Sequence, residues 1–283
     1  METKQSSNQS TLQQSNQPRL KEVLAVVNNK GGVGKTTTVQ SLAVAMTRYR
    51  KDWRVLVIDI DPQGDLSKLY GWNASRKGQP TVTDALADER GRLPIYKSDR
   101  GIYFVPSSPA LQKIEPKLMA QMQPYMVLRK LILGEVEDCT GEGIVSIPQD
   151  IDYVLIDCPP ALSMCTYNAM AVASGLLIPV QMEGLSVSGL APVIVEMERV
   201  KRELNPSLTL RGLLPVMIDP RPNIVRSFAE YLHQAYGENV CETTIPRSVK
   251  VNEAQTKKQD IYEYKQWSPV ANAYESLCKE LFG

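Results

Sequence analysis

Short, nearly continuous apolar runs alternate with longer segments of helical periodicity along this chain from residue 20 onward. The apolar runs predict strands at residues 23–27, 55–58, 102–105, 154–156, 176–180 and 210–217. The helical patterns cover residues 36–49, 116–133, 161–173, 188–204 and 222–236. Strands that are apolar on both faces are typical of a parallel sheet covered by helices. The pattern therefore predicts an α/β fold with a mostly parallel central sheet flanked by helices on both faces.

The same pattern indicates where the folded domain begins and ends. Residues 1–19 are rich in Ser, Gln and Asn, and they cannot bury enough apolar surface to offset the entropy of ordering. We therefore expect a disordered polar arm at 1–19 and a single domain over 20–283, with a surface loop at 134–150. Apolar residues at helical spacing predict a C-terminal helix that packs against the core; they are Val270, Ala273, Tyr274, Leu277 and Leu281.

Composition narrows the class of protein. With 283 residues, 43% of them apolar and 22% charged, the chain is long enough to bury a large core and has the composition of an ordinary soluble protein. It lacks an apolar run of the length that spans a bilayer, so no membrane association is expected. Five cysteines without a C-x-x-C pair argue against a disulfide framework or a zinc site. His233 is the only histidine, which excludes sites that need two.

The most informative segment follows the first predicted strand and precedes the first predicted helix. Its residues are Asn29, Lys30, Gly31, Gly32, Val33, Gly34, Lys35, Thr36 and Thr37. Strand, glycine-rich turn and helix in this order predict a phosphate-binding loop, in which backbone N–H groups surround phosphate oxygens. Lys35 is then expected to reach the β- and γ-phosphates of a nucleotide, and the Thr36 hydroxyl to ligate Mg²⁺. The usual loop has Gly where this chain has Asn29, and Lys30 is an additional lysine.

Carboxylates follow two of the predicted strands. Asp59 and Asp61 come at the end of the second strand, and Asp157 follows the strand at 154–156. Because alternate residues of a strand face the same way, Asp59 and Asp61 are both expected to point at the metal and the attacking water. An aspartate at a strand end, as Asp157 is, typically holds Mg²⁺ in nucleotide hydrolases with this loop.

Taken together, residues 30–37, 59–64 and 157–160 resemble the ParA branch of the deviant Walker A ATPases, and 178–181 and 244–250 also resemble segments of that family. ParA proteins are DNA-partitioning ATPases of bacterial plasmids and chromosomes. The resemblance extends from about Leu20 to the C-terminus. It implies a P-loop NTPase fold with a deviant Walker A motif, ATP and Mg²⁺ as cofactors, and an ATP-bound sandwich dimer.

The resemblance also implies roles for individual residues. Lys35 would bind the phosphates of its own subunit, and Lys30 would reach the nucleotide of the partner subunit. Asp59 would position the attacking water and Asp157 would support the metal. The implied nucleotide-binding set is Lys30, Gly31, Gly32, Val33, Gly34, Lys35, Thr36, Thr37 and Asp157, and the implied Mg²⁺ set is Thr36, Asp59 and Asp157.

The implied partners are double-stranded DNA, bound without sequence preference by the ATP dimer, and a ParB-like centromere-binding adaptor that stimulates hydrolysis. Such a protein is cytoplasmic and associated with the nucleoid. Between Arg199 and Lys258 the chain has ten Lys or Arg residues and six Asp or Glu residues, an excess that can form a positive face. The candidate DNA contacts are Arg247 and Lys250, followed by Arg221, Arg226, Lys257 and Lys258.

The chain departs from the family pattern in two places. The family often has Leu-Ser-Glu-Ala-Pro-Ser where this chain has Val-Asn-Glu-Ala-Gln-Thr at 251–256, so the DNA-contact surface is expected to differ in detail. The arm of about twenty residues is also too short for the helix-turn-helix domain of large plasmid members, which indicates the shorter type.

Two alternatives remain open at this stage. A MinD-like membrane-associated positioning ATPase has the same loop, but it needs a basic amphipathic C-terminal helix. Here Glu275, Lys279 and Glu280 leave the C-terminal segment without a basic face. A non-enzymatic binding module would bind nucleotide and release no phosphate.

Overall fold

The structure is a computed structural model that describes residues 20–73, 78–88, 91–134, 147–181, 187–219, 230 and 232–283. The predicted arm at 1–19 lies outside the described residues, as do most of the predicted loop at 134–150 and most of the predicted helix at 222–236. Residues 147–150, the described end of that loop, contain neither helix nor strand.

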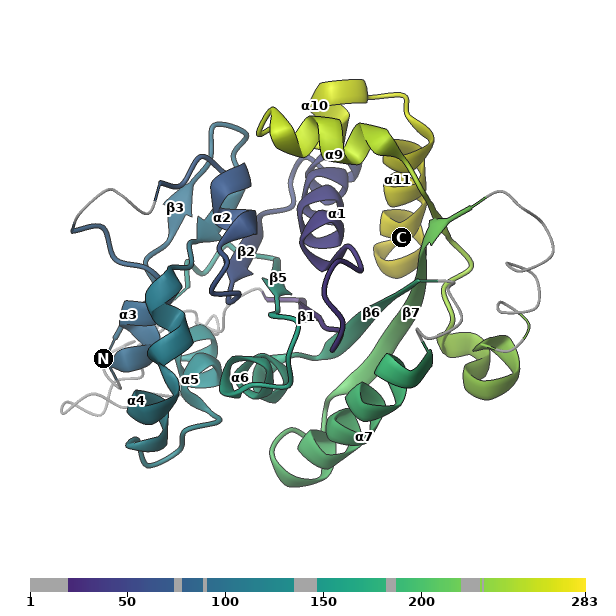
Figure 1. The fold of residues 1–283 in the computed structure, drawn as a ribbon. Coiled ribbons are helices and arrows are strands. Elements are labelled where there is room, and N and C mark those ends of the chain that lie inside the picture. Colours follow the sequence, from purple (N-terminus) through teal and green to yellow (C-terminus); the bar gives the residue numbers. More distant parts are fainter. Residues whose placement is uncertain are drawn as a thin grey trace, which may run out of the picture.

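A single sheet runs through the described part of the chain (Figure 1). Its strands are β1 (Glu22–Val26), β2 (Val55–Asp59), β3 (Tyr96–Lys97), β4 (Tyr103–Val105), β5 (Tyr153–Asp157), β6 (Gly175–Gln181), β7 (Thr209–Ile218) and β8 (Ile245–Pro246). In space their order is β3-β4-β2-β5-β1-β6-β7-β8, and all neighbours are parallel except β3 and β4. The mostly parallel sheet is thus confirmed, and each of the predicted strands ends within about one residue of its observed bounds.

Helices cover both faces of the sheet. They are α1 (Lys35–Tyr49), α2 (Asp65–Leu69), α3 (Val82–Ala87), α4 (Glu115–Met119), α5 (Val127–Leu133), α6 (Met164–Val172), α7 (Val187–Glu203), α9 (Val249–Thr256), α10 (Ile261–Lys265) and α11 (Pro269–Phe282), with 3-10 turns η1 (Pro109–Lys113) and η2 (Gly237–Asn239). Figure 1 shows α1 and α11 on one side of the sheet and α5, α6 and α7 on the other. Among the described residues, no helix has the length and apolar content needed to cross a membrane.

The strands have this arrangement because their side chains are apolar on both faces. In β1, Val23 and Ala25 belong to the cluster beneath α5, α6 and α7, whereas Leu24 and Val26 belong to the cluster beneath α1 and α11. All five residues of β2 and of β5 are buried. A strand with no face left for water must be covered on both sides, which explains the two helical layers.

The predicted helix at 116–133 was wrong in one respect. The structure has two short helices in its place, α4 and α5, with turns and bends between them. Pro124 lies in the interruption, and proline both lacks an N–H donor and disfavours helical backbone in the residue before it. Pro116, in contrast, lies in the first turn of α4, where proline is well tolerated.

The predicted C-terminal helix is confirmed as α11. Its buried residues include Val270, Tyr274, Leu277 and Leu281, which pack in the same cluster as α1. The Tyr274 hydroxyl lies 3.1 Å from that of Thr38, so a buried polar contact joins α11 to the first turns of α1. The apolar side of α11 is therefore buried in the core of the protein.

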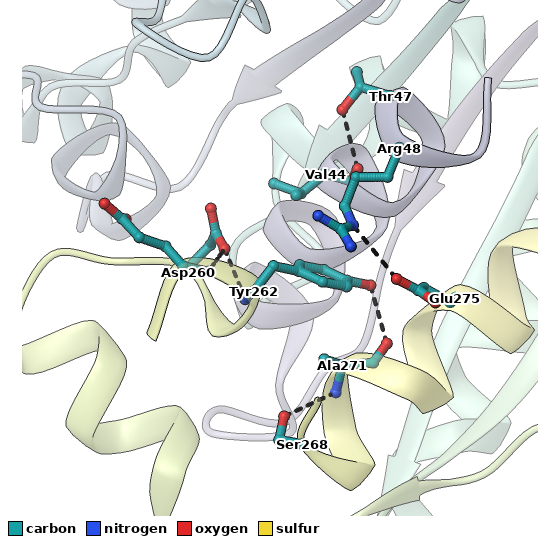
Figure 2. A network of polar contacts seen from close by, with 9 residues as sticks. Val44, Thr47, Arg48, Asp260, Tyr262, Ser268, Ala271 and Glu275 are labelled. Carbon is teal, nitrogen blue, oxygen red and sulfur yellow. Dashed lines mark hydrogen bonds and ion pairs between the residues drawn. The ribbon is translucent and has the colours of Figure 1, made fainter. Parts of the chain in front are cut away.

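A second set of polar contacts fixes the other end of α1 to α10 and α11 (Figure 2). Arg48 lies 3.4 Å from Glu275, and its guanidinium lies over the ring of Tyr262 at 5.1 Å. The Tyr262 hydroxyl donates a hydrogen bond to the Ala271 carbonyl at 3.1 Å. Together with the Thr38–Tyr274 contact, these bonds attach α1 at both ends to the C-terminal helices.

Candidate nucleotide site

The predicted phosphate-binding loop connects β1 to α1. Gly32 and Gly34 have φ values of 73° and 81°, which lie in the left-handed region that side chains disfavour. Gly34 precedes the first residue of α1, and its carbonyl accepts the first bond of the helix from the Thr38 N–H at 2.8 Å. The first N–H groups of a helix have no acceptor within it, so this turn offers donors to an anion.

A cavity of about 650 Å³ lies against this loop. One wall comes from the loop and the segments after β2 and β5: Gly31, Gly32, Gly34, Lys35, Thr36, Thr37, Asp61, Gln63, Asp65 and Pro160. A second wall comes from the end of β7, the segment from β8 through α9, and α11: Val216, Met217, Ile245, Pro246, Arg247, Ser248, Val249, Val251, Asn252, Gln255, Val270 and Tyr274. The volume falls within the range of small-molecule and cofactor sites.

Lys35 is buried within the loop, with only 6% of its surface exposed. Its Nζ donates a hydrogen bond to the Lys30 carbonyl at 3.0 Å, which holds the ammonium inside the curve of the loop. Burial lowers the pKa of Lys35, and the negative charges of Asp157 and Asp61 act in the opposite direction. A phosphate in the cavity would supply further negative charge to this ammonium.

The end of β6 supports the loop from the side. Gln181 accepts a hydrogen bond from Lys30 Nζ at 3.3 Å and donates one to the Gly32 carbonyl at 3.3 Å. Asn28 donates to the Pro179 carbonyl at 2.7 Å and accepts from the Lys30 N–H at 2.9 Å. Gln181 lies in one of the segments that resemble the family, but its sequence position alone predicts no role for it.

Met217 is a site residue that the sequence did not indicate. It lines the cavity near the end of β7 with φ of 55°, an uncommon conformation for a residue other than glycine. The pairing of β7 with β8 shifts register between Val216 and Ile218, so Met217 lies in an irregularity of the strand. Its Sδ accepts a hydrogen bond from Gln181 at 2.8 Å. Strained backbone of this kind is often found at functional sites.

Asp59 lies elsewhere than we expected. It is 1% exposed and, like Asp157, is not among the described residues that line the cavity. One carboxylate oxygen accepts hydrogen bonds from the Ser67 N–H at 2.8 Å and the Ser67 hydroxyl at 2.6 Å, and the other accepts from the Asp61 N–H at 3.1 Å. Burial raises the pKa of Asp59 to about 7, although the bonds from Ser67 and Asp61 act to lower it. Asp59 thus fixes α2 to the end of β2.

Asp61 takes the position that we had expected for both carboxylates. It is half-buried, lines the cavity and accepts a hydrogen bond from the Gln63 N–H at 2.9 Å. The expected common orientation of Asp59 and Asp61 is not observed, because side chains alternate in direction only within a strand. β2 ends at Asp59, and the backbone turns after it, so Asp61 no longer shares the orientation of Asp59.

Asp157 ends β5 directly beside Asp59, its partner in the strand register. It is 1% exposed, and neither carboxylate oxygen makes a hydrogen bond within the described residues. Burial raises the pKa of Asp157 well above its ordinary value, the charge of Asp59 raises it further, and the nearby Thr36 hydroxyl and Lys35 ammonium lower it. A buried carboxylate that accepts no hydrogen bond is a candidate ligand for a bound ion.

This donor set fits Mg²⁺. Magnesium prefers oxygen ligands, and at phosphate sites it uses one or two protein groups together with phosphate oxygens and water. Thr36 and Asp157 would supply those protein groups, whereas one oxygen of Asp59 already accepts two hydrogen bonds from Ser67 and the other accepts one from the Asp61 N–H. Within the described residues there is no group of three or more His, Cys, Asp or Glu side chains that could hold a metal alone.

The predicted DNA contacts that the structure describes lie on or next to α9. Arg247 lines the cavity. Lys250 binds both carboxylate oxygens of Glu253, at 2.8 and 3.1 Å, and Lys257 Nζ lies 5.0 Å from the centre of the Tyr264 ring.

Lys258 follows α9 and is exposed, with φ of 55°. Arg221 and Arg226, the other two candidates, lie outside the described residues.

The sheet, the glycine-rich loop and the cavity beside it define a P-loop nucleotide-binding protein. Comparisons with known proteins identify the family within this class. A family model described as an AAA domain matches residues 21–210. The chromosome-partitioning ATPase Soj of Thermus thermophilus is 34% identical over 91% of this chain and 94% of its own length. The chromosome partitioning protein ParA of Caulobacter vibrioides is 32% identical over 92% of this chain and 93% of its own length.

Among solved structures, cobyrinic acid a,c-diamide synthase from Mycobacterium smegmatis with a bound ATP analogue and magnesium is similar at 28% identity and a TM-score of 0.74, over 92% of this chain and 93% of that one. The extent and identity of the matches to the partitioning proteins are decisive. This chain belongs to the ParA/Soj family of partitioning ATPases.

Proposed function

We propose that this chain is a DNA-partitioning ATPase that hydrolyses ATP to ADP and phosphate. Its ATP-bound dimer binds double-stranded DNA without sequence preference, and hydrolysis, stimulated by a centromere-binding adaptor, releases the DNA. The observation that carries the proposal is the cavity itself. Its first wall is the phosphate-binding loop, and its second wall includes the segment that continues into the basic residues of α9.

Phosphate binding is the first step of the proposed mechanism. The N–H groups of the loop and the buried Lys35 ammonium would hold the phosphates, and Thr36 and Asp157 would hold Mg²⁺. When bound, Mg²⁺ would supply positive charge that neutralises the negative charge developing on the phosphates during transfer. Most of the catalysis in phosphoryl transfer comes from such positioning of charge.

We assign the orientation of the attacking water to Asp61 in place of Asp59. Asp61 lines the cavity, and a hydrogen bond from the Gln63 N–H steadies one of its oxygens. Its carboxylate can accept a proton of the water and direct the oxygen at the γ-phosphate. The hydrogen bonds from Ser67 leave Asp59 the role of holding α2.

Lys30 is proposed to act on the nucleotide of the partner subunit. In the single chain its ammonium lies 3.3 Å from Gln181 Oε1, a neutral acceptor that a phosphate can replace when two subunits meet. A lysine supplied by the partner adds positive charge at the phosphates only in the dimer. Hydrolysis would therefore depend on dimerisation.

The DNA contacts are proposed for Lys250, Lys257 and Lys258. Contacts with phosphates alone give binding that is independent of sequence and sensitive to salt. A dimer would join the basic segments of two chains into one surface, so DNA binding would require ATP. Arg247 lines the ATP cavity, and a test of DNA binding is therefore cleaner when it leaves this residue unchanged.

The membrane alternative gains no support from α11, because its apolar residues are buried against α1.

The discriminating experiment measures phosphate release from Mg-ATP with and without duplex DNA, at low and high salt, together with sedimentation on anionic liposomes. We expect hydrolysis that DNA increases at low salt, and no sedimentation. Nucleotide binding without phosphate release would indicate a non-enzymatic binding module. ATP-dependent sedimentation with lipid would indicate the MinD-like function.

A further inference from the structure

A side chain of α9, that of Gln255, makes a hydrogen bond to the phosphate-binding loop. The Nε2 atom of Gln255 donates a hydrogen bond to Oγ1 of Thr37 at 2.9 Å, and both residues line the cavity. Thr37 directly follows Thr36, the proposed Mg²⁺ ligand. The bond therefore connects the segment of predicted DNA contacts to the turn that would hold the phosphates.

The direction of this bond has a chemical consequence. An amide NH₂ group donates and cannot accept, so the Thr37 oxygen is the acceptor and its own proton is left for a second partner. In a cavity that holds phosphates, that partner is a phosphate oxygen. A carboxylate in place of the amide would take the Thr37 proton for itself. Gln255 thus sets the hydroxyl of Thr37 to donate into the cavity.

Lys250, a predicted DNA contact, lies on the same short helix as Gln255. Lys250 binds Glu253, which also accepts a hydrogen bond from the Tyr264 hydroxyl at 2.6 Å. Movement of α9 would therefore carry Lys250 with it. Gln255 also stands where the family pattern quoted above has proline, a residue without a side-chain donor. The bond is thus a property of this sequence.

We infer that Gln255 is a positioning residue that acts through Thr37 and couples occupancy of the ATP site to the order of α9. ATP completes a chain of hydrogen bonds from the phosphate through Thr37 to Gln255, and this chain fixes α9 together with Lys250. The inference relies on the proposed binding of ATP. Because coupling is reciprocal, a ligand bound to the ordered form of α9 raises the affinity for ATP by the same factor.

Hydrogen–deuterium exchange of the full chain, with and without a non-hydrolysable ATP analogue, tests this coupling. In the wild type the analogue should slow exchange both in residues 30–38 and in α9. Gln255→Met keeps the length of the side chain and removes the donor. In this variant the analogue should still slow exchange in the loop but should no longer slow it in α9. The variant should bind the analogue about threefold to tenfold more weakly, the range expected for one neutral hydrogen bond.

Two further variants separate positioning from a loss of structure. Gln255→Glu has the same shape and the opposite hydrogen-bond direction, and it should bind the analogue more weakly than Gln255→Met does. In a Thr37→Val background, Gln255→Met should cause no additional loss, because the two residues act as one unit. Gln259→Ala, a matched change of a glutamine just beyond α9 and outside the described lining of the cavity, should behave as the wild type.

The outcomes distinguish this inference from the proposed function. If the analogue fails to protect residues 30–38 of the wild type, ATP binding itself is wrong and both proposals fall. If it protects the loop without protecting α9, or if Gln255→Met matches the wild type in α9 protection and binds within about twofold, only the coupling is overturned.

Discussion

The two walls of the cavity differ in how their residues are brought together. The first is dominated by one short segment of the chain, the loop that includes Gly31, Lys35 and Thr36. The second is assembled from the ends of β7 and β8 with α9 and α11, and it begins about 180 residues after the loop, at Val216. The first wall therefore follows from local sequence, whereas the second exists only after the sheet has formed. We expect the first wall to determine whether ATP binds. We expect the second wall to determine how ATP binding affects α9 and DNA binding.

The largest expected effect of a substitution is a loss of ATP affinity at the first wall. Lys35→Ala removes the buried ammonium from the loop and should weaken ATP binding by at least about 100-fold, equivalent to ~2.7 kcal/mol. Equilibrium titration with a fluorescent ATP analogue measures this. Lys51→Ala, an exposed lysine beyond the other end of α1, is the matched control and should bind as the wild type. Unchanged affinity of the Lys35 variant would refute the phosphate-binding role of the loop.

Asp61→Ala should separate binding from chemistry. It should bind ATP with nearly wild-type affinity and lower turnover by about 100-fold, because the attacking water loses its proton acceptor. Single-turnover hydrolysis, measured beside an equilibrium titration, gives both quantities. Turnover within about threefold of wild type, a barrier change under ~1 kcal/mol, would move the role to another residue.

Asp59→Ala should act mainly on stability. The substitution leaves the buried N–H and hydroxyl of Ser67 without their acceptor, which should cost about 2 kcal/mol of unfolding free energy. Urea denaturation measures the loss, and turnover per folded molecule should fall much less than in Asp61→Ala. A variant of full stability that had lost turnover would return the catalytic role to Asp59.

The smallest expected effect is a loss of DNA affinity caused by substitutions at the end of α9, outside the second wall. Lys257→Glu combined with Lys258→Glu should weaken binding to unrelated duplexes by about tenfold and lower the slope of log affinity against log salt by roughly two. Filter binding over a salt series measures both. Lys113→Glu combined with Lys117→Glu, at exposed positions on η1 and α4, is the control for the change in charge. A slope equal to that of the wild type would place the DNA surface elsewhere.

The contrast between the walls also explains how far the sequence could predict this protein. The long buried strands, the loop and the position of Asp157 could be predicted from local patterns. Apolar runs and glycine-rich turns each indicate the conformation of the segment in which they occur. Asp59 and Asp61 were not separated, because the residue at which a strand ends is poorly specified by sequence. β3 and β8 have two residues each, too few to produce a period. The Gln255–Thr37 bond joins positions 218 residues apart and has no local signal.

The central claim is that ATP in this cavity controls DNA binding, and it is tested most directly by comparing two nucleotides. Filter binding on duplexes of unrelated sequence should be measured with a non-hydrolysable ATP analogue and with ADP, at the same salt concentrations. The account predicts affinity at least about tenfold higher with the ATP analogue, similar for all the duplexes, and a steep decline with salt. Equal affinity with both nucleotides would contradict it.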